Sequence, residues 1–345
     1  MTSTLHSIGT AHTKVSPEAL RINAADVANR ICDDMRRRLS GDLRRRGAVV
    51  GLSGGIDSTV TLGLCARALG PDRVFAVLMP ETGIDEDSLS LGELAARHFG
   101  VDFTVEDITP VLEALGHYRR YADAVRHVVP QYGEGWKSKI VTRNALSSGG
   151  FTFFYLVAHE PSGKIHKVRL PFKPYLELVA ATNFKQRTRK TIEYYHADRL
   201  HYAVVGTPNR LEYELGFFVK QGDGCADLMP IAHLYKSQVY LLADHLGAPS
   251  QIRERSPTTG TYSLSQGQDE FFFSLPYDKM DLCLYAKNSG IPAEAVASAV
   301  GLTLEQVKRA FADIDAKRST TRYLHLQPIL IEDVPGVRTD LERRI

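Results

Sequence analysis

Short apolar runs alternate with helical stretches along most of the chain. The runs at 48–52, 73–80, 101–107 and 201–207 have the length and β-branched content of buried strands, and helical periodicity occupies 25–45, 59–69, 86–99 and 175–199. This alternation predicts an α/β fold, a Rossmann-like doubly wound parallel sheet with helices on both faces. Ligands of such sheets bind beyond the carboxyl ends of the strands, so the residues after Leu52, Met79 and Val205 should converge on one site.

The alternation is interrupted between residues 116 and 174. Two β-rich runs in this stretch are joined by Pro161-Ser162-Gly163-Lys164, a sequence typical of a hairpin turn. We therefore interpret 116–174 as an insertion that carries a β-hairpin preceded by a loop.

The C-terminal part reads as helical from Tyr277 onward. Thr303, with Gln306 three positions later, predicts the N-cap and capping box of one of these helices. We expect one domain at 23–327, with an N-terminal tail at 1–22 and a C-terminal tail at 328–345.

Composition narrows the class of protein. The chain has 345 residues, a formal net charge of +2 and 43% hydrophobic residues, values of an ordinary soluble protein without a general surface for nucleic acid or membranes. Its four cysteines form no C-x-x-C pair, which argues against a zinc site and a disulfide framework and favours a cytoplasmic location.

The stretch SGGIDS, from Ser53 to Ser58, follows the first predicted strand and precedes a predicted helix. A glycine loop in this place presents backbone N–H groups and a helix N-terminus to an anion. No lysine precedes Ser58, so phosphate charge has to be met by backbone amides, hydroxyls and a metal that Asp57 can hold. The alternative is a purely structural turn capped by Asp57 and Ser58.

The loop resembles the pyrophosphate loop of the ATP pyrophosphatases, which adenylate their substrates. The blocks NFKQRTR, VVGTPNRLE, GFFVKQGDGCADLMPIAHLYKSQV and SPT resemble, in order and spacing, those of the NAD synthetases within that family. The resemblance implies that ATP adenylates the nicotinate carboxylate of deamido-NAD and that ammonia then displaces AMP, giving NAD, AMP and pyrophosphate.

The resemblance also implies roles for individual residues, with ATP and Mg²⁺ as cofactors. The implied ATP-binding residues are Gly51, Leu52, Ser53, Gly54, Gly55, Ile56, Asp57, Ser58, Thr207, Lys236 and Thr258. The implied deamido-NAD-binding residues are Arg187, Lys220, Asp227 and Lys317. Asp57 and Glu212 are expected to bind the metal, and Asp57, Lys236 and Asp223 to be catalytic. Taken alone, Glu212 also fits an exposed helix face and Asp223 a simple turn.

The expected partners are small molecules, with a homodimer implied by the resemblance. No cysteine has the surroundings of a glutaminase nucleophile, so the nitrogen should come from free ammonia or from a separate glutaminase. Two alternatives stay open. One is a paralogous amide synthetase for a different carboxylate, suggested by the insertion and by the altered segment TTGTYS; the other is a non-catalytic module that senses ATP.

Overall fold

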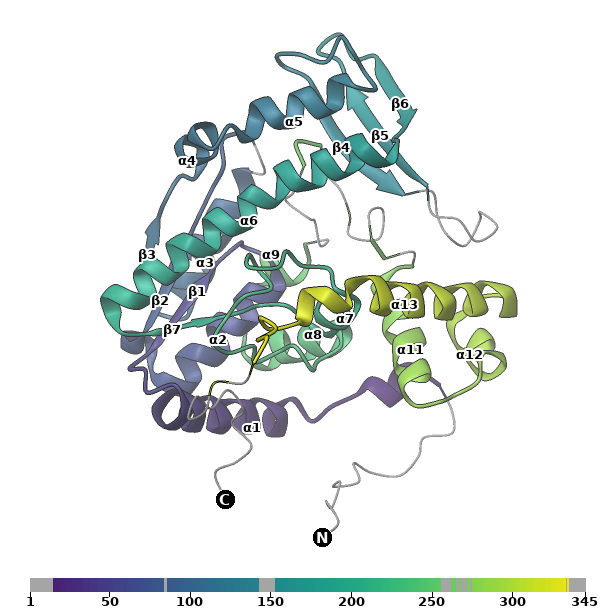
Figure 1. Ribbon diagram of the computed structural model, residues 1–345. Coiled ribbons are helices and arrows are strands. Elements are labelled where there is room, and N and C mark those ends of the chain that lie inside the picture. The colour runs from purple at the N-terminus through teal and green to yellow at the C-terminus, as the bar shows by residue number, and fades with distance from the viewer. Residues whose placement is uncertain are drawn as a thin grey trace.

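The protein is described by a computed structural model (Figure 1). It describes residues 15–83, 86–142, 153–255, 262–264, 267, 272–273, 275–332 and 334. The predicted boundaries of the domain and its two tails stay predictions.

A four-stranded parallel sheet with the order β3-β2-β1-β7 lies at the centre. Its strands are β1 (Ala48–Gly51), β2 (Val74–Leu78), β3 (Asp102–Val105) and β7 (Ala203–Val205). In the middle of the sheet Val49 pairs with Phe75 on one side and with Val204 on the other. Because β1 is covered on both faces, it reads as a continuous apolar run instead of an alternating one.

Helices cover both faces of this sheet, as the sequence predicts. One face packs against α1 (Ala24–Arg37), α2 (Ile56–Leu69), α3 (Glu86–His98) and α8 (Lys236–His245). The other face packs against α4 (Thr109–Ala114) and α6 (Phe172–Leu200), as Figure 1 shows for the long diagonal helix α6. Val50 belongs to the first core and its neighbour Val49 to the second, because successive side chains of a strand point to opposite faces.

The first helix is shorter than the sequence predicts. We expected one helix over 25–45, but α1 ends at Arg37 and continues as one π-helical segment, η2 (Arg38–Asp42). Ser40 and Gly41 lie inside that segment, and both residue types favour the α-helix less than the arginines before them.

A helical layer closes the C-terminal side. It contains η1 (Pro17–Leu20), α7 (Arg210–Leu215), α11 (Tyr277–Asn288), α12 (Ala293–Val300) and α13 (Leu304–His325), while η3 (Pro71–Arg73) and α9 (Ser250–Arg253) are short connectors. The predicted cap of α13 is confirmed, since the Gln306 N–H donates to Thr303 Oγ1 over 3.2 Å and the Thr303 N–H donates to Gln306 Oε1 over 2.9 Å.

The predicted insertion contains a three-stranded antiparallel sheet, which we call the inserted sheet. Its strands are β4 (Lys137–Thr142), β5 (Phe154–His159) and β6 (Ile165–Arg169), and α5 (His117–Arg126) precedes them. The predicted hairpin is confirmed between β5 and β6, where the Gly163 N–H donates to the Glu160 carbonyl. The preceding stretch, which we expected to be a loop, holds α5 and β4 instead.

The inserted sheet has a core of its own against α5 and the beginning of α6. Leu156 is fully buried there, and the chain's single tryptophan, Trp136, packs between Tyr132 and His166 with ring centroids 5.6 and 5.3 Å away. Helix α6 joins the two sheets, because Leu178 belongs to this core and Ala197 to the core of the central sheet. Among the described helices, none is long and apolar enough to cross a membrane.

Replacing Leu156 by alanine tests whether the inserted sheet folds around this core. We expect the free energy of unfolding to fall by about 2–5 kcal/mol, because the change leaves a cavity in a closely packed interior. Val157→Ala is the matched control, since Val157 lies next to Leu156 but on the half-buried face, and it should cost clearly less. Denaturant unfolding followed by circular dichroism measures both. Equal losses would mean that this core does not stabilise the fold.

Candidate active site

A cavity of ≈ 490 Å³ opens at the carboxyl edge of the central sheet. The segments that follow β1, β2 and β7 all line it, so the predicted convergence is confirmed. The predicted site residues among its lining are Gly51, Leu52, Ser53, Gly55, Ile56, Asp57, Ser58, Thr207, Glu212, Asp223 and Lys236.

The glycine loop is shorter than the sequence predicts. Helix α2 begins at Ile56 rather than Thr59, so Asp57 and Ser58 lie in its first turn and its N-terminus borders the cavity. Serine hydroxyls hold the loop closed: Ser53 Oγ and Ser58 Oγ lie 3.1 Å apart, and Ser58 Oγ donates to the Gly55 carbonyl over 3.0 Å. Gly55 is suited to the N-cap, where it leaves helical N–H groups accessible for an anion.

A buried ion pair occupies the wall beside this loop. Lys236 Nζ donates to Asp57 Oδ2, and the Lys236 side chain is only 1% exposed. Burial by itself would lower the pKa of Lys236, but the charges of Asp57 and Glu212 outweigh it and hold the pKa above its ordinary value. The amine is therefore a permanent cation at neutral pH.

Asn209 connects the two predicted metal-binding carboxylates. Its Nδ2 donates to Asp57 Oδ1 over 3.1 Å, and its backbone N–H donates to Glu212 Oε2, also over 3.1 Å. Asn209 is fully buried and is the N-cap of α7, with Glu212 completing the capping box. Glu212 is thus half-buried at the cavity and does not lie on an exposed helix face.

Asp281 of α11 fixes the position of Lys236. Its two carboxylate oxygens accept from the backbone N–H groups of Lys236 and Ser237, over 3.2 and 2.7 Å, at the first turn of α8. Asp281 is fully buried, and this burial raises its pKa to about 6. A carboxylate at this end of the helix also offsets the unfavourable placement of a lysine there.

Helix α6 contributes a charged wall on the opposite side of the cavity. Lys185 Nζ lies 3.0 Å from Glu81 Oε2, at the end of β2, and Lys190 Nζ donates to Glu193 Oε2 over 2.6 Å. All four side chains are less than 10% exposed. Arg189 also lines the cavity and donates to the Met79 carbonyl over 3.4 Å.

Asp223 combines both roles considered for it. Its Oδ1 accepts from the Val219 N–H over 2.7 Å, which is turn chemistry, and its side chain lines the cavity. Burial raises the pKa of Asp223, although the Val219 N–H and the charge of Lys190 act in the opposite direction.

Gly54 of the glycine loop does not line this cavity, and neither do the four predicted deamido-NAD-binding residues. Lys220 Nζ donates to the Tyr323 and Leu326 carbonyls at the end of α13, over 2.8 Å each. Arg187 is exposed and donates to the Lys220 carbonyl. Asp227 accepts from the Val204 N–H, and Lys317 pairs with Asp313. The four residues outside the cavity are thus Arg187, Lys220, Asp227 and Lys317. Thr258 lies outside the described residues.

The sequence interpretation missed Asn209 and the wall of α6. The pattern Asn209-x-x-Glu212 after a strand was a capping-box signal that places both residues at a helix start. Lys185 and Arg189 are four residues apart and lie on one face of a helix, which singles them out from Arg187.

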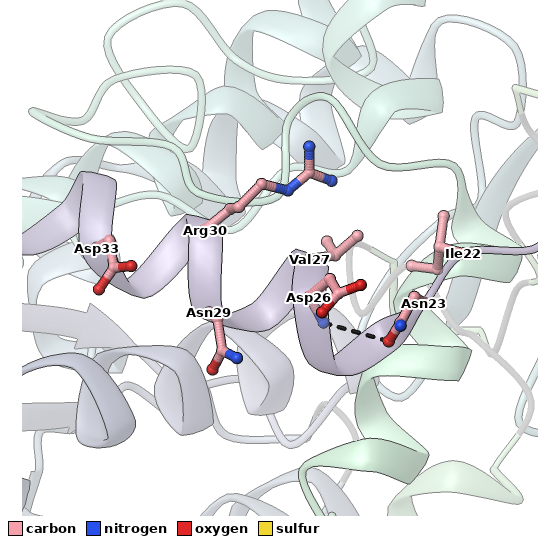
Figure 2. A pocket seen from close by; sticks show the side chains of 7 residues that line it. All are labelled: Ile22, Asn23, Asp26, Val27, Asn29, Arg30 and Asp33. Carbon is pink, nitrogen blue, oxygen red and sulfur yellow. Dashed lines mark hydrogen bonds between the residues drawn. The ribbon is translucent and has the colours of Figure 1, made fainter. Parts of the chain in front are cut away.

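A second hollow, of ≈ 680 Å³, lies along α1 (Figure 2). Figure 2 shows that Arg30 and Asn29 point to opposite sides of the helix, so the polar groups there do not converge. None of the predicted site residues borders it.

The sequence model of the NAD synthase family matches residues 27–131 and 162–322. The NH(3)-dependent NAD(+) synthetase of Rhizobium meliloti (strain 1021) is 58% identical over 322 residues, which cover 93% of this chain and 96% of that protein. The protein of the same name from Thermotoga neapolitana is 37% identical over 240 residues, which cover 69% of this chain and 77% of that protein.

Two solved structures share the fold. The NH3-dependent NAD synthetase from Campylobacter jejuni in complex with the nitrate ion has a TM-score of 0.59 at 20% identity, covering 90% of this chain and 100% of that one. The NMN synthetase from Francisella tularensis has a TM-score of 0.61 at 18% identity, covering 90% and 99%.

Gly54 and Gly55 offer a matched test of the loop geometry. Gly54 has a φ of +74°, and a Cβ there would lie 2.4 Å from the Ser88 carbonyl, whereas at Gly55 the nearest atom would be Ser53 Oγ, 3.3 Å away. Gly54→Ala should lower the free energy of unfolding by at least about 1–2 kcal/mol, because it adds backbone strain to a clash. Gly55→Ala should cost less. Thermal unfolding measures both, and a tolerated Gly54→Ala would contradict this loop conformation.

Proposed function

The chain belongs to the NAD synthase family, and from this premise we propose that it is an ammonia-dependent NAD synthetase. The nicotinate carboxylate of deamido-NAD attacks the α-phosphorus of ATP, forming an acyl adenylate and releasing pyrophosphate. Ammonia then attacks the acyl carbon, and AMP leaves with the electron pair of the broken C–O bond, which gives NAD. The observation that supports this proposal is the cluster of the buried Lys236 with the half-buried Asp57 and Glu212 beside the glycine loop.

We place the phosphates of ATP at the N-terminus of α2. Three features support this assignment: free helical N–H groups, the hydroxyls of Ser53 and Ser58, and the Lys236 cation on the adjacent wall. Thr207 lines the same cavity and belongs to the same proposed site. The Lys236 cation stabilises the charge that develops as the pyrophosphate leaves.

Asp57 and Glu212 fit the needs of Mg²⁺. The part of the chain that the structure describes holds no group of three or more metal-ligating side chains, so a metal here would complete its shell with phosphate oxygens and water. Two carboxylates that flank Asn209 are the donor set expected for that arrangement. When bound, Mg²⁺ would neutralise phosphate charge.

We assign Asp223 to the amidation step. Its raised pKa makes it a better proton acceptor than an ordinary carboxylate, which suits a group that takes a proton from the incoming ammonium. The charge of Lys190, on the wall of α6, acts against the rise of this pKa.

The residues proposed to bind deamido-NAD are spread over a wider area than the cavity. Arg187, Lys220, Asp227 and Lys317 lie outside the cavity, as would suit a long dinucleotide that extends beyond it. We propose a homodimer in which the far end of the dinucleotide reaches the subunit boundary, and we retain Thr258 as an ATP contact. The ammonia source, free or from a separate glutaminase, belongs to the same proposal.

The paralogue alternative is not favoured. The alignment with the NH(3)-dependent NAD(+) synthetase of Rhizobium meliloti covers 93% of this chain and 96% of that protein at 58% identity, which favours the same activity over a different carboxylate substrate.

Pyrophosphate release from ATP-Mg²⁺ and ammonium tests the proposal directly. We expect release to depend on deamido-NAD and NAD to appear in equal amount. Release that ignores deamido-NAD but responds to another carboxylate would support the paralogue, and ATP binding without any turnover would support a sensor.

Of the two carboxylate variants, Glu212→Gln tests the proposed metal site more directly. It should lower kcat/KM by about 10²–10³-fold and shift the Mg²⁺ dependence to higher concentrations, because a neutral amide binds the metal and its phosphates less well. Asp57→Asn should in addition lower the free energy of unfolding by about 3–5 kcal/mol, since it leaves Lys236 buried without its partner. Asp123→Asn, at an exposed ion pair on α5, is the control and should change neither. An unchanged Mg²⁺ dependence in Glu212→Gln would remove Glu212 from the metal site.

A further inference from the structure

The inserted sheet contacts a segment that borders the active-site cavity. The Ser138 N–H of β4 donates to Ser263 Oγ over 2.9 Å, and the Ser138 carbonyl accepts from Ser263 Oγ and from the Leu264 N–H, over 3.4 Å each. The two serines are 125 positions apart in the sequence, and Ser263 follows directly after Tyr262, which lines the cavity.

Ser138 is itself held rigidly inside the inserted sheet. It is fully buried, and its Oγ lies 2.9 Å from the Tyr121 hydroxyl and 3.2 Å from the Tyr132 hydroxyl. Because the side chain and the backbone groups of Ser138 are all hydrogen-bonded, Ser138 can hold Ser263 in one position.

Tyr262 is shared between the two parts of the molecule. Its side chain belongs to the core of the inserted sheet, where it is 5% exposed, and it also lines the cavity. Tyr175 has the same double position, since it lines the cavity while its ring stacks on Phe154 of β5 with centroids 4.1 Å apart. Two aromatic side chains of the cavity wall are therefore supported from the inserted sheet.

We infer that the inserted sheet is a second scaffold of the active site, in which Ser138 holds Ser263 so that Tyr262, beside Tyr175, forms a wall that binds a planar ring of a substrate. The inference rests on the proposed function, whose two large substrates, ATP and deamido-NAD, both carry planar heteroaromatic rings. Aromatic side chains bind such rings by stacking or edge contacts. Ser138 and Ser263 are thus positioning residues, and they act through Tyr262.

Part of the inserted sheet lies outside the residues that match the family model. The match leaves out residues 132–161, which include β4 and β5, so Ser138 and Phe154 lie in a part of the chain that the family model does not describe. Tyr175 and Tyr262 lie inside the matched residues, so the cavity wall belongs to the part shared with the family, whereas its support by Ser138 and Phe154 lies outside that part.

Ser263→Ala tests the inference through steady-state kinetics in full-length protein, with the KM of each substrate measured separately. Losing the two hydrogen bonds of Ser263 Oγ to Ser138 should raise the KM of one substrate about fivefold, with kcat changed by less than about twofold. The substrate whose KM rises, ATP or deamido-NAD, identifies the ring. Tyr262→Ala should raise the same KM about tenfold, and Tyr262→Leu serves in its place if the alanine variant does not fold.

Two variants act as matched controls. Ser263→Thr keeps the hydroxyl and should restore the wild-type KM. Ser162→Ala removes a hydroxyl whose hydrogen bond, among the described residues, goes to Glu160 in the hairpin turn of the same inserted sheet, and it should leave both KM values unchanged. Wild-type KM values in folded Ser263→Ala and Tyr262 variants would overturn the inference, as would an equal rise in Ser162→Ala.

NAD formation by the wild-type protein is measured first, so that a failure of the proposed function can be distinguished from a failure of this inference. If wild-type protein forms no NAD, the proposed function fails, and the affinity for ATP-Mg²⁺ measured by calorimetry then decides the inference. The affinity for deamido-NAD is measured in the same way. A weaker affinity for either ligand in Ser263→Ala than in wild type and Ser162→Ala would support the inference, and equal affinities for both would overturn it.

Discussion

A buried lysine at the beginning of a helix is the constraint around which the site is organised. Lys236 is almost fully enclosed and lies at the end of α8 where the helix dipole disfavours a cation. It is stable there because Asp57 pairs with its amine and Asp281 accepts from its backbone N–H. The first turns of α2, α7 and α8 consequently lie close together, and the charges of the proposed site lie where these three helices begin.

Much of this arrangement is readable in the sequence. Continuous apolar runs are typical of strands covered on both faces, so the parallel sheet and the edge at which its loops meet could be predicted. Strand β4 could not, because it alternates Ser138 and Ile140 with Lys137 and Lys139, and a buried serine looks like a loop residue until its hydrogen-bond partners are known. The start of α2 was placed too late for a related reason: Gly55, which looked like part of the loop, is the N-cap.

The residues of α6 that line the cavity could not be identified from the sequence for a different reason. The sequence identifies a helix rich in basic residues, but no apolar stripe marks its inner face, since it touches two cores and a charged cavity along its length. Helical spacing separates Arg189 from Arg187, but only the packing reveals that the face of Arg189 borders the cavity while Arg187 is exposed. The contact between Ser138 and Ser263 is likewise invisible, because nothing local to either serine points to the other.

Trp136 gives the molecule a built-in optical reporter. It is the chain's single indole, and it is half-buried against the core of the inserted sheet, between Tyr132 and His166. Its emission therefore responds to the packing of that sheet and hardly to the central one, whereas far-ultraviolet dichroism averages over every helix. Comparing tryptophan emission with far-ultraviolet dichroism during unfolding shows which of the two sheets unfolds first, without any added label.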